Sequence, residues 1–69
     1  MKIRYDRDVD ALTIVFQSDR QIRESDEPNP GVVMDYDDDG ALVSIEVLNA
    51  SKRFEDLDSI QYEKTPAGR

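Results

Sequence analysis

Acidic residues between positions 35 and 46 form the pattern in this sequence that most closely matches a binding site. Asp35, Asp37 and Asp39 alternate with other residues, Gly40 follows, and Glu46 comes after five further residues. This spacing satisfies the sequence form of an EF-hand calcium loop. Calcium binds roughly six to eight oxygen ligands, and such a loop supplies carboxylates and a backbone carbonyl around one ion. The segment is therefore a candidate calcium site.

The flanking residues predict strands, whereas an EF-hand loop requires a helix on each side. Residues 31–34 and 43–47 are rich in β-branched residues, which is typical of strands. Asp and Gly tolerate positive φ, so Asp39-Gly40 between two strands is also what a hairpin turn requires. We favour the turn and keep weak calcium binding as an alternative. The turn would leave three acidic side chains on one face of the hairpin: Asp35, Asp37 and Glu46.

Groups that support catalysis are scarce in the composition. The chain has no His and no Cys, so its serines lack the partner that usually activates a nucleophile. The same absence removes disulfides and the common zinc sites. A working carboxylate pair needs a cleft that shifts one pKa, and a thin sheet of this length has little material for walls. We therefore predict a non-catalytic protein without a cofactor, although four carboxylates are candidates for acid–base work: Asp8, Asp10, Glu24 and Glu46.

The charge balance is strongly acidic. With 16 acidic and 9 basic residues the formal net charge is −7, which argues against nucleic acid because binding to its phosphates relies on Lys and Arg. A basic protein is the partner that this charge favours. No stretch approaches the ~20 apolar residues of a membrane-spanning helix, and the first residues alternate charged and apolar types, unlike a signal peptide. We therefore expect a cytoplasmic protein that binds no membrane.

Two stretches of alternating residues predict an N-terminal hairpin. Ile3 and Tyr5 alternate with charged residues, and Leu12 and Ile14 alternate with neighbours such as Thr13, which is the period of half-buried strands. A four-residue loop at positions 7–10 would place Tyr5 opposite Leu12 and Ile3 opposite Ile14. The apolar side chains of both strands would then share one face.

A second hairpin is predicted around Asp39-Gly40. If these two residues form a type I′ turn, three apolar pairs face each other on one side of the hairpin. A four-residue loop keeps the same faces, whereas a three-residue loop with a bulge needs a local adjustment. The predicted pairs are Tyr36 with Val43, Met34 with Ile45, and Val32 with Val47.

The remaining segments predict shorter elements. Residues 21–26 suit a charged edge strand, residues 28–31 contain two prolines and suit a connection, and residues 60–62 suit one more strand. Ser51 or Asn49 is placed to cap a helical turn. We predict a mainly β (α+β) fold, a small antiparallel sheet of four to five strands with one short helical element near residues 51–57. Residues 1–64 would form one small domain and residues 65–69 a flexible tail.

A chain of 69 residues has a thin core, because such a domain buries only about 60% of the surface that its unfolded chain exposes. Small scaffolds add disulfides, a metal or a second subunit, and the composition leaves the second subunit. Three apolar residues on the opposite sheet face need cover from residues 54–57 or from another chain: Val15, Val33 and Leu42. We therefore predict a homodimer that acts as a protein-interaction module.

Three stretches of the chain carry a family resemblance. They are Tyr5-Asp6 with Asp10-Ala11-Leu12-Thr13-Ile14, then Pro30-Gly31-Val32-Val33-Met34-Asp35-Tyr36-Asp37 with Asp39-Gly40, and Val43-Ser44-Ile45-Glu46-Val47-Leu48-Asn49-Ala50-Ser51-Lys52-Arg53. In these stretches the chain resembles a small bacterial family catalogued as a domain of unknown function, number 2283. It departs from the family pattern at Asn49, where an aspartate is common, and in a shorter, more polar end.

The resemblance implies a fold rather than a reaction. A member of this family is expected to form a compact antiparallel sheet with a short helical element and to self-associate, and no catalytic residues are established for transfer to this chain. Some relatives lie beside small toxin-like proteins. The resemblance therefore adds an alternative function, in which the chain is an antitoxin-like partner that neutralises a small basic toxin.

Overall fold

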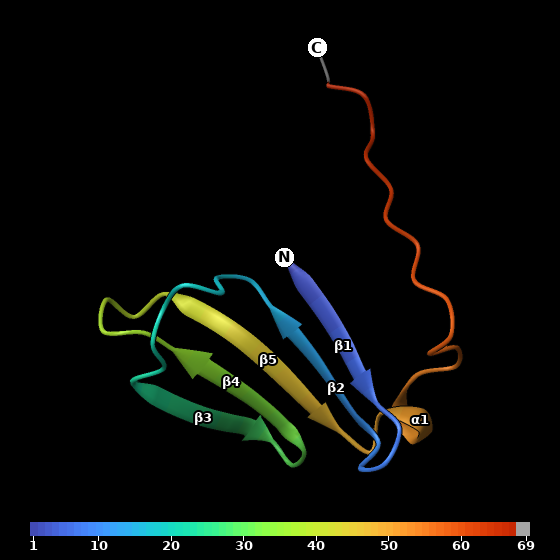
Figure 1. The fold of residues 1–69 in the computed structure, drawn as a ribbon, viewed down its shortest axis with the longest axis horizontal. Coiled ribbons are helices and arrows are strands. Elements are labelled where there is room, and N and C mark those ends of the chain that lie inside the picture. The colour runs from blue at the N-terminus through green and yellow to red at the C-terminus, as the bar shows by residue number, and fades with distance from the viewer. Residues whose placement is uncertain (68–69) are drawn as a thin grey trace.

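The first hairpin of the computed structural model, which describes residues 1–67 of the chain, has the predicted register (Figure 1). Strand β1 (Lys2–Asp6) pairs antiparallel with β2 (Ala11–Val15). Asp10, the last residue of the connecting loop, has a φ of 55°. Because side chains alternate between the faces of a sheet, this register brings the apolar residues of both strands to one face. Two predicted pairs are confirmed: Ile3 with Ile14 and Tyr5 with Leu12.

The second hairpin is confirmed in two of its three predicted pairs. Strand β4 (Val32–Tyr36) pairs antiparallel with β5 (Leu42–Leu48). The predicted pair of Tyr36 with Val43 was wrong, because the register shifts at this point and Tyr36 lies opposite Leu42. Leu42 therefore shares the face of Tyr36 and not the opposite face on which it was predicted. The pairs that form as predicted are Met34 with Ile45 and Val32 with Val47.

The turn of this hairpin is longer than the two residues of a type I′ turn. Such a turn needs positive φ at both central residues, and of Asp39 and Gly40 only Gly40 has it, at 80°. The N–H of Gly40 donates to the carbonyl oxygen of Asp37 at 3.1 Å, and the N–H of Asp37 donates to the carbonyl oxygen of Ala41 at 3.0 Å. The connection therefore spans residues 37–41, and the shift leaves Val43 without an opposite residue in β4.

The predicted edge strand exists, but it begins three residues later. Strand β3 (Glu24–Asn29) pairs with β4 and is exposed along its whole length. Pro28 lies inside it, against the prediction of a connection, because an edge strand tolerates a residue without an N–H where its pairing is irregular. The register indeed shifts between Asp26 and Asn29. A turn through Pro30-Gly31 then joins β3 to β4, with Gly31 at a φ of 85°.

The predicted helical element is confirmed as α1 (Ala50–Arg53), which begins one residue earlier and ends at Arg53. Asn49 precedes it with a φ of 55° and makes no side-chain cap. Ser51 lies inside the helix, so neither predicted cap forms. The first amides bind Asp10 of the β1–β2 loop instead, with the N–H of Ala50 donating to its carbonyl oxygen at 3.0 Å.

The five strands form one sheet in the order β1-β2-β5-β4-β3, with α1 at the end where β5 finishes (Figure 1). Residues 54–67, called the arm below, bend at positions 55, 57 and 58 and then run away from this sheet as an extended segment (Figure 1). The strand predicted at residues 60–62 does not form, and positions 68 and 69 of the predicted tail lie outside the described residues. Through residue 67, no helix is long and apolar enough to cross a membrane.

Within the described residues the core is small. Four apolar residues are buried, and no large side chain is less than 2% exposed. A sheet normally buries its apolar face against a second layer of structure. Residues 1–67 supply only one turn of helix for that purpose, so most of the sheet lacks a second layer among them. The buried apolar residues are Ala11, Val43, Val47 and Ala50.

Candidate functional site

The acidic loop between β4 and β5 is organised around Asp37. This residue is only 5% exposed, and its Oδ1 accepts hydrogen bonds from the N–H groups of Asp39 and Ala41, both at 2.9 Å. An Asp side chain that binds backbone amides a few residues ahead is a common way to stabilise a turn. Asp37, one of the calcium candidates, therefore uses its Oδ1 to stabilise the loop in which it lies.

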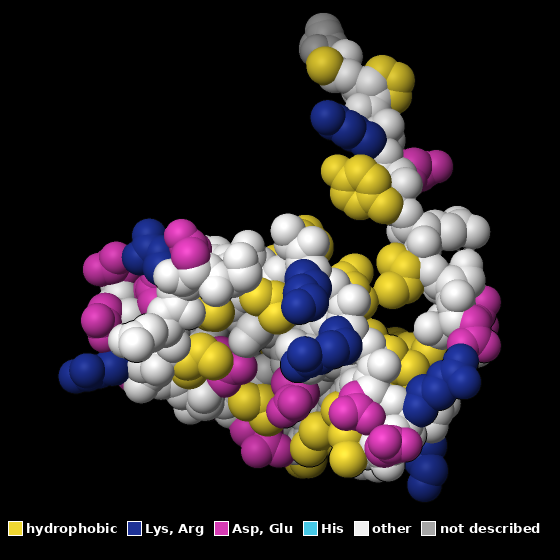
Figure 2. All heavy atoms as spheres, viewed as in Figure 1, with side chains coloured by type: hydrophobic (Ala, Val, Ile, Leu, Met, Phe, Trp, Pro, Cys, Tyr) yellow, Lys and Arg dark blue, Asp and Glu magenta, His cyan; other side chains and the backbone are white. Residues whose placement is uncertain are grey.

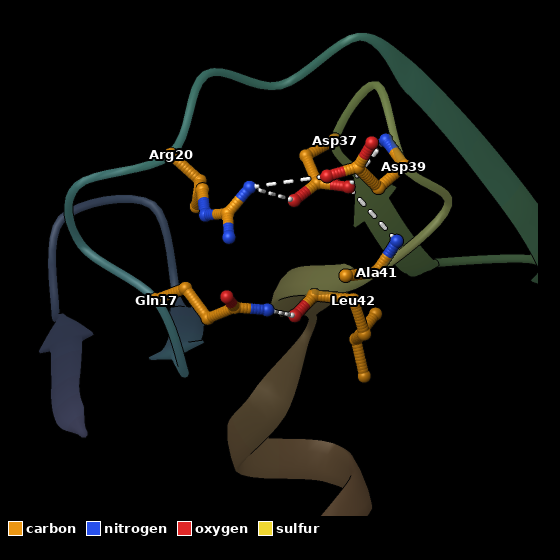
Figure 3. Close-up of polar contacts among 6 residues, drawn as sticks. All are labelled: Gln17, Arg20, Asp37, Asp39, Ala41 and Leu42. Carbon is orange, nitrogen blue, oxygen red and sulfur yellow. Dashed lines mark hydrogen bonds and ion pairs between the residues drawn. The ribbon is translucent and has the colours of Figure 1, made fainter.

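Arg20, from the β2–β3 connection, forms ion pairs with two carboxylates of this loop (Figure 3). Its Nη1 lies 3.3 Å from Oδ2 of Asp37 and 3.4 Å from Oδ2 of Asp39. Oδ2 of Asp37 is buried and receives no hydrogen bond, so the guanidinium is its compensating charge. Asp39 is largely exposed, and its contact with Arg20 contributes little because water screens it. Nearby, Gln17 Nε2 donates to the carbonyl oxygen of Leu42 at 2.9 Å.

The other two calcium candidates lie on the sheet, away from the loop. Asp35 accepts hydrogen bonds from two serine hydroxyls, Ser25 Oγ at 2.5 Å on Oδ1 and Ser44 Oγ at 2.8 Å on Oδ2. Glu46 lies further along β5, opposite Thr13 and Val33. Asp37 lies beyond the end of β4, in the loop, and is buried there. Residues 1–67 contain no group of three or more His, Cys, Asp or Glu side chains that could hold a metal ion.

Asp10 joins the first hairpin to α1. Its Oδ1 accepts hydrogen bonds from the Tyr5 hydroxyl at 2.6 Å and the Ser51 N–H at 2.9 Å, and its Oδ2 accepts one from the Ser51 hydroxyl at 2.6 Å. The hydrogen bonds from the Ser51 and Tyr5 side chains lower the pKa of Asp10. The bond to Asp10 in turn raises the pKa of Tyr5. Because both carboxylate oxygens of Asp10 accept hydrogen bonds from within the chain, Asp10 holds α1 against the first hairpin.

Arg53 joins α1 to the β3–β4 turn. Its guanidinium donates to two backbone carbonyl oxygens, those of Leu48 and Pro30. The Cα of Gly31 lies so close that an added Cβ would be 2.6 Å from Nη2 of Arg53. The basic pair Lys52-Arg53 is therefore not a free cationic site, since Arg53 supports the backbone at the end of the sheet.

One face of the sheet is apolar across four strands. A single cross-strand row contains Ile3, Ile14, Ile45 and Met34, and it ends at Asp26 of β3. The next row along the strands has the same character. We define the apolar face by the residues that β1, β2, β5 and β4 contribute to this side of the sheet: Ile3, Tyr5, Leu12, Ile14, Ile45, Val47, Leu42, Val32, Met34 and Tyr36.

Most of the apolar face is not buried within the chain. Of its ten residues only Val47 is buried, and Ile3 is 40% exposed. The opposite face is mixed: the row beside the isoleucines contains Arg4, Thr13 and Glu46. Figure 2 shows one side of the molecule, on which acidic and basic side chains are interspersed with hydrophobic ones over the strands. A face that is apolar over several strands and uncovered is the feature of this chain that calls for a binding partner.

The arm begins beside the apolar face. Its first apolar residues, Phe54 and Leu57, line an open cleft together with Tyr5 and Arg7. Further along, the hydrophobic side chains lie away from the sheet (Figure 2), with Ile60 59% and Tyr62 84% exposed. The arm therefore adds unburied apolar surface to that of the sheet.

Sequence reasoning missed three of the residues that organise the structure. Asp10 was considered only as one of several carboxylates, Ser51 only as a cap, and Arg53 only as part of a basic pair. Asp10 and Ser51 are 41 positions apart, and Arg53 and Pro30 are 23 apart, so no local spacing signals either contact. The one available signal was Asp10 itself, since Asp is among the few residues that adopt positive φ readily.

Comparison with known proteins places the chain in a family but not in a functional class. The family model described as "Protein of unknown function (DUF2283)" matches residues 2–51, a span that includes all five strands and the start of α1. No curated protein and no solved structure matches the chain. The matched span contains the first two stretches on which the resemblance was identified, and the third as far as Ser51. The chain therefore belongs to the DUF2283 family of proteins of unknown function.

Proposed function

We propose that this chain is a non-catalytic, cytoplasmic protein-interaction module that works as a homodimer, with two copies packed through the apolar face. The observation that carries the proposal is that four neighbouring strands present ten apolar residues on one side, over which residues 1–67 place no second layer. Exposed apolar patches of this kind mark sites of protein contact. A second copy supplies an identical sheet, and two sheets packed face to face form a sandwich about 10 Å apart.

The charged residues at the border of the apolar face are consistent with packing of a second copy on that face. The apolar face ends at β3, where Asp26 stands opposite Met34 and Glu24 stands opposite Tyr36. These carboxylates give the patch a polar rim, which is the anatomy of protein–protein interfaces. They also protect the exposed edge of β3 from pairing with other strands. Contact is thereby directed to the face rather than to this edge.

Analytical ultracentrifugation at increasing protein concentration tests the proposal. The natural chain is expected to sediment as a dimer at high micromolar concentration. Ile14→Lys places a charge at the centre of the apolar face, between Ile3 and Ile45, and is expected to weaken the dimer at least a hundredfold. The effect is large because burial of one Ile is worth about 1.5–3 kcal/mol and a two-fold dimer carries the substitution twice.

The matched control is Thr13→Lys, in the same strand but on the opposite face, between Arg4 and Glu46. It is expected to leave the dissociation constant within about threefold of the natural value. Ile3→Lys serves as a second apolar-face variant, because Ile3 lies on an edge strand and is 40% exposed, so its substitution is compatible with folding. A natural chain that remains monomeric at high micromolar concentration would overturn the proposal.

The acidic edge supports a second candidate, binding of a basic protein in the manner of an antitoxin that neutralises a small basic toxin. Three acidic residues lie on β3, which is exposed along its length: Glu24, Asp26 and Glu27. Complementary charge speeds association and is weakened by salt. Capture of a basic partner from the native host, lost at high salt and lost after neutralising substitutions in β3, would support this function. Capture that is unchanged by those substitutions would reject it.

A further inference from the structure

The two edges of the sheet differ in how they are protected. Strand β3 carries three acidic residues, Pro28 and a register shift, which are the features that prevent pairing at an edge. Strand β1 pairs with β2 without any shift and contains no proline. Its charged residues are Lys2, Arg4 and Asp6, so cations exceed anions along it. In residues 1–67 no strand pairs on its outer side. The β1 edge is therefore the open, basic edge of the sheet.

The arm has the composition of a strand that fits this edge. It is extended, and Ile60 and Tyr62 alternate with polar residues, which is the period of a half-buried strand. Between residues 55 and 64 it contains four acidic residues and one lysine, so its charge is complementary to that of β1. Extended segments commonly bind by adding a strand to an exposed sheet edge.

One antiparallel register satisfies both the apolar and the charged positions. With Tyr62 opposite Ile3, Ile60 falls opposite Tyr5 and both arm side chains join the apolar face. The polar positions of the arm then match those of β1 as well: Glu63 faces Lys2, Gln61 faces Arg4 and Asp58 faces Arg7. A shift of two residues in one direction places Asp58 opposite Tyr5, and in the other direction it places Lys64 opposite Ile3. Both shifts put a charge on the apolar face.

The arm does not occupy the β1 edge of its own chain. It runs away from the sheet (Figure 1), and among the described residues its side chains reach β1 and the loop after it only through the cleft near Tyr5 and the contact of Asp58 with Arg7, 3.3 Å between two largely exposed groups. It also begins beside the apolar face, which is the side on which a second sheet would lie.

The area of the apolar face also indicates that the arm of a second copy contributes to the dimer interface. Four strands of about five residues cover roughly 19 by 17 Å at ordinary strand spacing and rise, or about 320 Å² in projection. Even doubled for side-chain relief, this is below the ~800 Å² that each partner buries in a standard interface. A five-residue segment added to each β1 edge extends the sheet by one strand in each copy.

We propose that, in the dimer, residues 59–63 of each copy add to β1 of the other copy as a sixth antiparallel strand, with Tyr62 opposite Ile3. This inference rests on the proposed homodimer and identifies a second contact within it. Exchange of the arms covers the open β1 edge, buries Ile60 and Tyr62, and pairs the acidic arm with the basic strand.

Disulfide cross-linking tests the register, since the natural chain has no Cys. A tagged full-length Arg4→Cys protein is mixed with an untagged Gln61→Cys protein and oxidised. Directly opposed strand residues lie within the range of Cα separations that a disulfide spans, so a mixed disulfide is expected at least tenfold above the control. The control mixes Arg4→Cys with Ser59→Cys. In the proposed register Ser59 lies on the same side of the arm as Gln61 but opposite Asp6, two residues away from Arg4.

The outcomes separate the arm exchange from the homodimer. Equal cross-linking of the Gln61→Cys and Ser59→Cys proteins, or a disulfide closed within one Arg4→Cys/Gln61→Cys chain, overturns the exchange. If sedimentation still shows a dimer, the apolar-face proposal survives that result, whereas a strictly monomeric chain rejects both. As a second measurement, Ile60→Ser/Tyr62→Ser is expected to raise the dimer dissociation constant at least tenfold. A matched Ser59→Ala/Gln61→Ala protein is expected to change it less than threefold, and equal effects count against the exchange.

Discussion

Substitution of Gly31 by Ala should destabilise this protein about twice as much as substitution of Gly40 by Ala. Both glycines have positive φ, 85° and 80°, so addition of a Cβ introduces about the same backbone strain at each position. They differ in their surroundings. A Cβ on Gly40 has no atom within 4 Å, whereas one on Gly31 meets Nη2 of Arg53 at 2.6 Å.

The magnitudes follow from this difference. Left-handed backbone costs a residue with a Cβ about 1–2 kcal/mol, and loss of the flexible glycine from the unfolded chain returns about 0.4–1 kcal/mol. Gly40→Ala should therefore cost about 1 kcal/mol. Gly31→Ala also displaces the Arg53 side chain, whose two hydrogen bonds to exposed carbonyl oxygens contribute about 1 kcal/mol together. Its total cost should be about 2 kcal/mol.

Thermal unfolding at one fixed protein concentration measures both effects, since self-association makes the midpoint concentration-dependent. For a domain of this size 1 kcal/mol lowers Tm by about 4–8 °C. Arg53→Ala is the control background, in which the costs of Gly31→Ala and Gly40→Ala should become equal. Equal costs in the natural background, or a difference that persists without Arg53, would show that the contact between Gly31 and Arg53 does not anchor α1.

Three further predictions concern the acidic residues. Asp37→Ala should lower the free energy of unfolding by about 2 kcal/mol, because it leaves two loop amides without an acceptor, whereas Asp39→Ala should change it by less than about 0.5 kcal/mol; equal losses in urea denaturation would contradict the assigned roles. The pKa of Asp10 is lowered in the folded state, so its stabilisation is present above the unfolded value near 3.8 and is lost as pH falls. Ser51→Ala should therefore make stability less pH-dependent below pH 5, and an unchanged pH profile of the unfolding midpoint would refute this. Calcium at ~5 mM should move Tm by less than about 1 °C, since a site with a millimolar dissociation constant would raise it by several degrees, and such a rise would revive the calcium hypothesis.

The acidic segment shows how far spacing alone can be interpreted. Alternating Asp residues followed by Gly suit both a calcium loop and a hairpin loop, because each needs short carboxylates and a residue with positive φ. The strand-forming residues on either side favoured the hairpin, and the structure has it. Sequence reasoning did not anticipate that Asp37 is buried beside Arg20, because Arg20 comes from a connection with no regular pattern.

The predicted register was wrong where side-chain hydrogen bonds to backbone amides change the length of a loop. The pairs of the first hairpin followed from alternation alone, because a slip by one residue would place the apolar side chains of the two strands on opposite faces. Near Tyr36 the hydrogen bonds of Asp37 lengthen the loop, and the pairing shifts to compensate. Strand β3 continues through Pro28, further than expected, because irregular pairing at an edge accommodates this residue.

The sequence by itself determined four of the five strands, most of the pairing within the two hairpins, the apolar face of each hairpin and the acidic charge. These follow from local alternation and composition, which the chain carries wherever it folds. Only the tertiary structure decided that Asp10 and Arg53 anchor α1, since those contacts join positions far apart in the chain. It also decided that the apolar face is left uncovered and that the arm runs away from the sheet, because burial depends on which elements pack together and not on the order of residues within any one of them.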